Sequence, residues 1–190
     1  MVQRKAAYPI DNIFLQRWSP RAMTGEELSD EKLLSLFEAA RWAPSSYNNQ
    51  PWRFLYAKRN TKEWNVFFDL MVEFNQSWTK NASALVVVVS KKTFDFSGKP
   101  AQTHSFDTGA AWMSLALQAT KQGLVAHGMQ GFDYDKAKKA LNVPDDYNVE
   151  AMLAIGKQGK KDLLPKEMQD KEEPSDRKKL SEIAWEGKFK

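Results

Sequence analysis

Arginine and serine alternate in the segment RWSPR, residues 17–21. Alternate side chains of an extended backbone point to the same side, so Arg17, Ser19 and Arg21 would share one face. Two guanidinium groups with a hydroxyl between them can bind an anion, because arginine presents a fork of N–H donors to phosphate or to a developing oxyanion. A solvated turn with scattered surface arginines is the alternative interpretation.

A second cluster, APSSYNNQPWRF at residues 43–54, is rich in neutral hydrogen-bonding groups. Pro44 opens it, and Ser45, Ser46, Asn48 and Gln50 supply hydroxyl and amide groups that both donate and accept. Such groups match the edge of a neutral heteroaromatic ring better than charged side chains do. The alternative is a hydrogen-bonded loop at a helix exit, held in place by two prolines.

The third candidate is HGMQGFD, residues 127–133, in which two glycines flank Met129 and Gln130. Backbone amides beside Gly128 and Gly131 could approach a flat ligand closely, although a pair of glycines alone is a weak signal. We expect the two histidines, at positions 104 and 127, to be structural, since neither has a triad-type arrangement nearby. Neither GxGxxG nor GxxxxGK[ST] occurs, so a Rossmann or P-loop phosphate site gains no support.

The composition limits the class of protein. A chain of 190 residues with 42% hydrophobic residues predicts a single domain, residues 1–190, with a substantial core. The absence of cysteine and the presence of only two histidines exclude a disulfide scaffold, a thiolate nucleophile and a Cys/His zinc cluster, and we predict no metal site. Catalysis by the protein's own nucleophile is therefore not expected.

Charge and hydropathy bear on partners and location. The net charge is +4, but from residue 157 onward ten Lys/Arg mix with eight Asp/Glu, which argues against nucleic-acid binding. The longest aliphatic run, ALVVVV at residues 84–89, is far shorter than a membrane helix, and the N-terminal region has no signal-peptide pattern. We expect a cytoplasmic protein with no membrane partner.

Hydrophobic periodicity predicts the elements that must position these clusters. LSDEKLLSLFEAARWAP reads as an amphipathic helix capped by Asp30 and closed by Pro44, with an apolar face of Leu33, Leu34, Phe37 and Ala40. WRFLYA has the composition of a strand, and a second helix is expected over residues 61–80. ALVVVV reads as a strand buried on both faces, because it lacks alternation.

The central segment HSFDTGAAWMSLALQATKQG, residues 104–123, predicts a helix that is apolar on nearly all sides, with Gly123 as its C-cap. Such a helix occupies the centre of a domain or a subunit interface. LVAHGMQGFD continues from it, followed by a short helix at 135–141, a strand at EAMLAIG and a charged loop at 157–178. Helices and strands alternate, which indicates an α+β or α/β class.

Taken together and in this order, the motifs resemble the nitroreductase family of FMN-dependent oxidoreductases. The matching blocks cover about nine-tenths of the chain and comprise RWSPR, EAARWAPSSYNNQPWRF, FNQSWTKNASALVVVV, DTGAAWMSLALQATKQGL, and GMQGFD with ALNVPDDYNVEAMLAIG. The resemblance implies an α+β fold with a central mixed sheet flanked by helices. It also implies an intertwined homodimer with two FMN sites, each lined by both subunits.

The resemblance implies residue roles as well. Arg17 and Ser19 would hold the flavin phosphate, Arg21 and Asn75 would reach the pyrimidine edge, and the loop at 45–48 would come from the partner chain. The FMN redox atom N5 would lie beside Gln130 and Gly131 and would carry the chemistry, so no catalytic side chain is expected. The cofactor-binding set is Arg17, Trp18, Ser19, Arg21, Pro44, Ser45, Ser46, Asn48, Gln50, Asn75, Met129, Gln130, Gly131, Arg177 and Lys179.

The implied reaction is hydride transfer from NADH or NADPH to a small flat acceptor, such as a nitroaromatic or a quinone, by a ping-pong mechanism. Alternatives with the same fold are flavin fragmentation, reductive dehalogenation, or flavin binding without turnover. Two tryptophans depart from the family pattern, because Trp18 and Trp78 stand where members often carry a basic residue. The link KKTFDFSGKPAQT is short for a substrate-covering insertion, which leaves the acceptor open.

Overall fold

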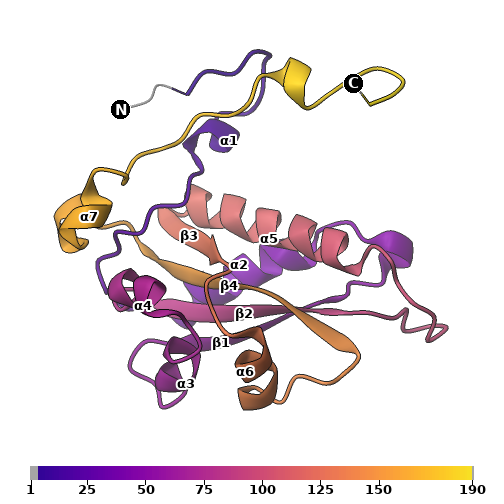
Figure 1. Ribbon diagram of the computed structural model, residues 1–190, viewed down its shortest axis with the longest axis horizontal. Coiled ribbons are helices and arrows are strands. Elements are labelled where there is room, and N and C mark those ends of the chain that lie inside the picture. Colours follow the sequence, from indigo (N-terminus) through magenta and orange to yellow (C-terminus); the bar gives the residue numbers. More distant parts are fainter. Residues whose placement is uncertain (1–3, 190) are drawn as a thin grey trace.

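A computed structural model describes residues 4–189, in which a four-stranded sheet lies between two layers of helices (Figure 1). The strand order is β1-β2-β4-β3, and the strands are β1 Trp52–Lys58, β2 Ala84–Lys91, β3 Leu124–Met129 and β4 Tyr147–Lys157. All three pairings are antiparallel, which corrects the expected mixed sheet. Strands β2 and β3 run parallel to each other, but β4 lies between them in the sheet. Each of them therefore pairs only with antiparallel neighbours.

Strand β2 is buried on both faces, as its unbroken apolar sequence predicts. Ala84, Val86 and Val88 pack into the core on one face of the sheet. The alternate residues Leu85, Val87 and Val89 pack into the core on the other face. One central strand therefore serves two cores, and this explains its lack of polar residues.

Helices α2 (Asp30–Arg41) and α5 (His104–Lys121) cover the first face. The N-cap of α2 is Ser29 rather than the expected Asp30, because the Ser29 hydroxyl accepts the hydrogen bond from the Lys32 N–H. Its buried residues are Leu33, Leu36 and Ala40, whereas Leu34 is 50% exposed. Spacings of three and four residues keep a helical face in contact with the sheet, and Leu34 lies off that face.

Helix α5 ends as predicted, with Gly123 at φ +69 just beyond it. One of its faces packs Ala111, Leu115 and Ala119 into the core. Burial on nearly all sides is not found within the described protomer, because Phe106 is 80% exposed and Met113 is also exposed. The helix thus presents an apolar outer face.

The opposite face of the sheet carries α3 (Trp64–Phe68), α4 (Glu73–Thr79) and α6 (Tyr134–Ala140). The single helix expected over residues 61–80 is therefore two helices. The chain breaks between them because Met71 pairs with Phe132 and the Val72 N–H donates to the Gly131 carbonyl at 3.1 Å. Tertiary hydrogen bonds replace helical ones at this point. The segment after Gly123, which carried no strand prediction, forms β3.

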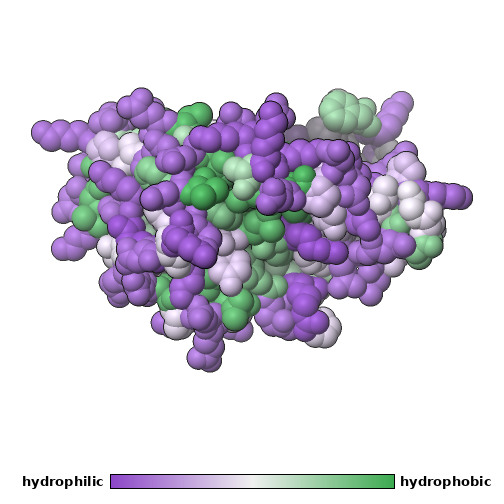
Figure 2. Space-filling view, turned by 90° about the horizontal axis from the view of Figure 1, so that it is seen from below, coloured by the Kyte–Doolittle hydropathy of each residue, from purple (hydrophilic) through white to green (hydrophobic). Residues whose placement is uncertain are grey.

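The remaining elements are short: α1 (Ile13–Gln16), α7 (Lys166–Gln169), and 3₁₀ turns at Ser46–Asn48, Lys161–Leu163 and Leu180–Glu182. The N-terminal and C-terminal segments run side by side beyond α1 (Figure 1). Most of the face seen in Figure 2 is hydrophilic, with apolar surface along its middle. Within residues 4–189, none of the helices combines the length and apolarity that a membrane span requires.

Candidate functional site

The segment at residues 17–21 and the C-terminal segment enclose a cavity of about 330 Å³ that is rich in cationic side chains. Four guanidinium groups and one ammonium group line it together with one carboxylate, so its charge is strongly positive. The ion pairs found among residues 4–189 involve none of these four arginines. The lining residues are Arg4, Arg17, Trp18, Ser19, Arg21, His127, Lys171, Glu173, Ser175 and Arg177.

Arg17 shows how strongly the positive charges interact. Its Nη1 donates to the Ser19 hydroxyl at 3.5 Å, as the alternating pattern predicts. Burial lowers the pKa of Arg17 below its ordinary value, and the charges of Arg177 and Arg4 lower it further. The guanidinium still stays protonated at neutral pH. An anion in this cavity would relieve the repulsion, so the residues present fit a phosphate group.

Arg4 joins three segments around the cavity. Its Nη1 donates to the carbonyl oxygens of Leu15 at 3.1 Å and Arg17 at 2.7 Å, and its Nε donates to the Ser175 carbonyl at 2.9 Å. The sequence interpretation missed Arg4, Lys171, Glu173 and Ser175. No local pattern distinguishes them, because they converge only through contacts between distant parts of the chain.

Glu172 attaches the C-terminal segment to the arginine segment from the other side. Its Oε1 accepts hydrogen bonds from the backbone N–H groups of Arg21 at 2.7 Å and Ala22 at 2.8 Å. Of the two late basic residues in the predicted cofactor-binding set, Arg177 lines the cavity, whereas Lys179 does not. The backbone of Lys179 instead donates to Glu182 in a short turn.

His127 forms part of the cavity wall and is half-buried. Its Nδ1 lies 3.1 Å from the Pro20 carbonyl, which can only accept, so Nδ1 carries the proton. Its ring packs against Trp78 at 4.7 Å between centroids. Burial lowers the pKa of His127 below 6.5, the Pro20 hydrogen bond opposes this, and the Arg21 charge adds to the lowering. His127 is therefore neutral at pH 7.

Asn75 and Gly131, which the resemblance assigns to the flavin ring, meet directly. Asn75 is 8% exposed, and its Nδ2 donates to the Gly131 carbonyl at 2.9 Å. Its Oδ1 accepts from the Trp78 indole at 3.2 Å, which leaves one amide hydrogen for a ligand. Met129 is buried at the end of β3 and Gln130 is exposed beside it. Their predicted contacts with the ring remain predictions.

The loop at residues 45–50 is held by its own polar groups and by α5. The Ser46 N–H donates to Asp107 Oδ2 at 3.0 Å, and the Ser45 hydroxyl accepts from the Gln50 N–H at 3.0 Å. Tyr47, Asn48 and Gln50 have φ values of 52°, 53° and 48°, in the left-handed region. Such backbone costs about 1–2 kcal/mol for each residue with a side chain, and it clusters at functional sites. Tyr47 and Asn48 project into solvent.

The loop and the arginine cavity lie at opposite ends of the sheet. Trp52, which follows the loop, pairs with Ser90, and Ser90 pairs with Asn148 near the start of β4. Thr24, which follows the arginine segment, donates to the carbonyl of Lys157 at the end of β4. Nine residues of strand separate these ends, about 30 Å. One protomer alone therefore does not bring the two predicted clusters together.

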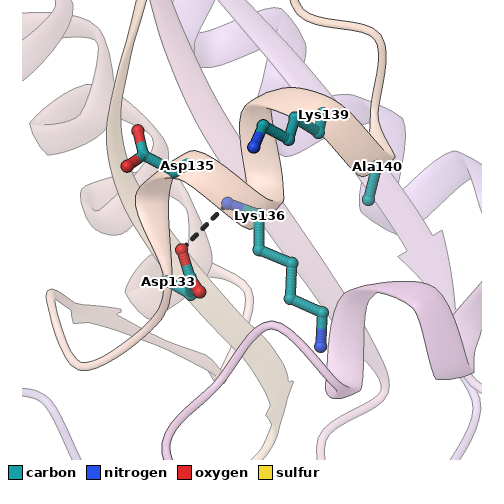
Figure 3. A pocket seen from close by; sticks show the side chains of 5 residues that line it. All are labelled: Asp133, Asp135, Lys136, Lys139 and Ala140. Atoms are coloured by element: carbon teal, nitrogen blue, oxygen red, sulfur yellow. Dashed lines mark hydrogen bonds between the residues drawn. The ribbon is translucent and has the colours of Figure 1, made fainter.

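A further depression of about 560 Å³ lies beside α6 and is lined by Asp133, Asp135, Lys136, Lys139 and Ala140 (Figure 3). Asp133 Oδ1 accepts from the Lys136 N–H at 2.9 Å, so it caps α6. The Lys136 ammonium donates to the Asp69 carbonyl at 2.7 Å. These groups serve the local structure, and none of the predicted site residues lies here.

Known proteins are similar to this chain in fold and in sequence. The model of the nitroreductase family matches residues 14–157. A crystal structure described as an oxidoreductase containing FMN is 45% identical, has a TM-score of 0.95 and aligns over 100% of this chain and 99% of that chain. A nitroreductase family protein from Clostridium difficile 630 shares the fold, with 23% identity, a TM-score of 0.72 and coverage of 96% and 100%. An oxygen-insensitive NADPH nitroreductase from Helicobacter pylori is 41% identical over 66 residues, which is 35% of this chain and 30% of that protein.

These matches confirm the resemblance found in the sequence motifs, since the family match alone spans residues 14–157 of a chain of 190. The chain belongs to the nitroreductase family.

Proposed function

We propose that the protein is an FMN-dependent oxidoreductase that takes a hydride from NADH or NADPH and delivers it to a small flat acceptor, such as a nitroaromatic or a quinone, in a ping-pong reaction. The observation that carries this proposal is the cavity of four arginines and Lys171 with a single carboxylate, Glu173. A phosphate ester near neutral pH carries about two negative charges, which such a cavity would stabilise. The FMN named for the 45% identical structure supports the choice of phosphate ligand.

The chain's residues would divide the work of binding. Arg17, Ser19 and Arg177 line the cavity and would bind the phosphate end of FMN. Lys171 also lines the cavity and would supply the ammonium group that the sequence assigned to Lys179. Bound FMN would supply a ring that accepts a hydride and passes it on. Arg21 would stabilise the negative charge that the ring gains on reduction, because a fixed guanidinium requires no reorganisation.

We also propose a homodimer with shared sites, which the separation of the two clusters supports. The 45–50 loop lies about 30 Å along the sheet from the arginines, so its amide and hydroxyl groups can reach the same flavin only from a second copy of the chain. The apolar outer face of α5, with Phe106 and Met113 exposed, offers a surface that a second copy would cover. We further propose that the whole chain acts as one domain within this dimer.

The direct test is spectroscopic. The purified protein should be yellow, and its flavin absorbance should bleach when NADH or NADPH is added without oxygen. Titrating both donors anaerobically would show which one the enzyme uses, and light scattering would give the mass of the assembly. A colourless protein that also fails to bind added FMN would refute the proposal, and a flavoprotein that neither donor reduces would refute the hydride-transfer part.

A further inference from the structure

The link between β2 and α5 folds back on itself as a small hairpin. Thr93 and Pro100 form a β-bridge, and the Phe94 N–H donates to the Lys99 carbonyl at 2.9 Å. Gly98 makes the reversal at φ +66, and its N–H donates to the Phe94 carbonyl at 2.8 Å. The short link is therefore ordered, and its tip has a defined shape.

Asn49 fastens this hairpin to the 45–50 loop. Its Nδ2 donates to the Thr93 carbonyl at 3.2 Å, and its Oδ1 accepts from the Asp95 N–H at 3.0 Å. Of the two adjacent asparagines, Asn49 thus connects two loops while Asn48 stays exposed. Since the 45–50 loop is the one proposed to reach the flavin of a second copy, the hairpin would accompany it to that site.

Three aromatic rings meet where the two loops join. Tyr47 lies 5.6 Å from Phe94 and 5.7 Å from Phe96 between ring centroids, and the two phenylalanines lie 5.3 Å apart. Tyr47 is 81% exposed and Phe96 is 69% exposed. Tyr47 also holds a left-handed backbone, which is unfavourable for a residue with a side chain. A strained loop that presents contacting rings to solvent is typical of a binding surface.

A cavity of about 460 Å³ borders Phe94, one of these three rings, and is lined by Ser46, Phe94, Lys99, Pro100, Gln102 and Thr103. Lys99 is the charged residue of this lining, and the ion pairs among residues 4–189 do not include it. The nearby acids are engaged elsewhere. Asp107 accepts from the Ser46 N–H and the Thr103 hydroxyl, and Asp95 pairs with Lys91.

We propose that Tyr47, Phe94, Phe96 and Lys99 form the acceptor-binding surface, and that it selects a planar aromatic compound carrying an anionic substituent. The rings would contact the flat face of the acceptor, and the Lys99 ammonium would pair with its negative group. This inference rests on the proposed function, because it names the class of acceptor that the reduced flavin would meet.

The test compares two acceptors of similar shape and different charge, 4-nitrobenzoate and the neutral 4-nitrobenzamide. The FMN-loaded enzyme is first reduced with dithionite without oxygen, so that donor binding plays no part, and reoxidation is followed against acceptor concentration. Lys99→Met keeps the length of the side chain and removes its charge. It should weaken the apparent affinity for 4-nitrobenzoate about two- to fivefold and change that for 4-nitrobenzamide much less. Lys62→Met, at an exposed lysine near α3, is the matched control and should alter neither.

Phe96→Ala should weaken the apparent affinity for both acceptors about three- to tenfold, because it removes ring contact rather than charge. Added salt should reduce the preference of the unmodified enzyme for 4-nitrobenzoate. Equal effects of Lys99→Met on the two acceptors, or no effect of Phe96→Ala on either, would overturn the inference.

Failure of the proposed function would look different. If neither nicotinamide reduces the flavin, hydride transfer from NAD(P)H is refuted, while the dithionite-reduced enzyme still tests the acceptor surface. If FMN does not bind at all, proton NMR line broadening of 4-nitrobenzoate by the protein decides the question. Broadening that Lys99→Met and Phe96→Ala both reduce would support the site, and broadening that neither changes would refute it.

Discussion

The side-chain amide of Asn75 donates a 2.9 Å hydrogen bond to the carbonyl oxygen of Gly131. The contact links α4 to the turn after β3, and the Trp78 indole fixes the amide's orientation from the other side. A Cβ atom at position 131 would lie 2.6 Å from Asn75 Nδ2 and 3.2 Å from a methyl group of Val72. Close packing therefore favours glycine at position 131, because a methyl group there would have to displace the Asn75 amide.

Gly131→Ala should lower the free energy of unfolding by about 1–3 kcal/mol, because the added methyl group forces Asn75 to move. Asn75→Ala should be destabilising on its own, since it leaves the Trp78 N–H without its partner. In the double variant the cost of the alanine at position 131 should be much smaller than in the single variant. Urea unfolding of the four proteins measures this coupling, and additive effects would contradict the packing argument.

Arg21→Ala should lower the flavin reduction potential by about 20–40 mV, which corresponds to the loss of roughly 1–2 kcal/mol of stabilisation of the reduced form. Hydride acceptance should slow, and the mass of the assembly should stay unchanged. The measurement is a spectroscopic redox titration. Arg41→Ala is the control, because Arg41 is exposed on α2 and pairs with Glu38 away from the cavity. An unchanged potential in Arg21→Ala would show that this guanidinium does not act on the ring.

Asp107→Ala should loosen the 45–50 loop, since the Asp107 carboxylate accepts from both the Ser46 N–H and the Thr103 hydroxyl. Each hydrogen bond to a charged group is worth about 1.5–3 kcal/mol, so we expect FMN to bind at least tenfold more weakly. Fluorescence titration with FMN gives the dissociation constant. Thr103→Val removes only the hydroxyl partner and should have a smaller effect, so an equal loss in both variants would contradict this role for the Ser46 contact.

His127 predicts a pH dependence of stability. Its folded-state pKa is lowered mainly by burial, so the unfolded chain binds a proton more readily. Above pH 6.5, the ordinary pKa of histidine, His127 is neutral in both states and its full contribution to stability is present. This contribution is lost as the pH falls from 6.5 toward the folded-state pKa, because the unfolded chain takes up the proton first. Urea unfolding between pH 7.5 and about 5 should show this loss. His127→Gln should flatten the profile in this window, and an unchanged profile would assign the dependence to other groups.

Arg4→Met should release the N-terminal segment, because Arg4 donates to Leu15, Arg17 and Ser175. Truncation leaves three carbonyl oxygens without this donor, and we expect a loss of about 1–3 kcal/mol together with faster proteolysis near the chain ends. Lys5→Met is the control, since Lys5 is exposed beside it. Equal protease sensitivity of the two variants would show that Arg4 does not hold these segments together.

The local features of this protein could be read from its sequence. The unbroken aliphatic run of β2 predicts its burial on both faces, and Gly123 predicts the end of α5. Both features are determined by residues that are adjacent in the sequence. Arg17, Ser19 and Arg21, which the alternation in RWSPR predicted on one side of the chain, line one cavity, and Trp18 between them lines it as well. The family resemblance rested on the order of such local motifs.

Convergence of distant segments was decided only by the tertiary structure. The break between α3 and α4 arises from hydrogen bonds to residues some sixty positions away, and no helical pattern records them. Arg4, Lys171 and Ser175 reach the arginine cavity because Glu172 and Arg4 tie the two ends of the chain together. The packing of these segments sets which side chains share a cavity, whereas sequence periodicity reports only which face each side chain occupies on its own element.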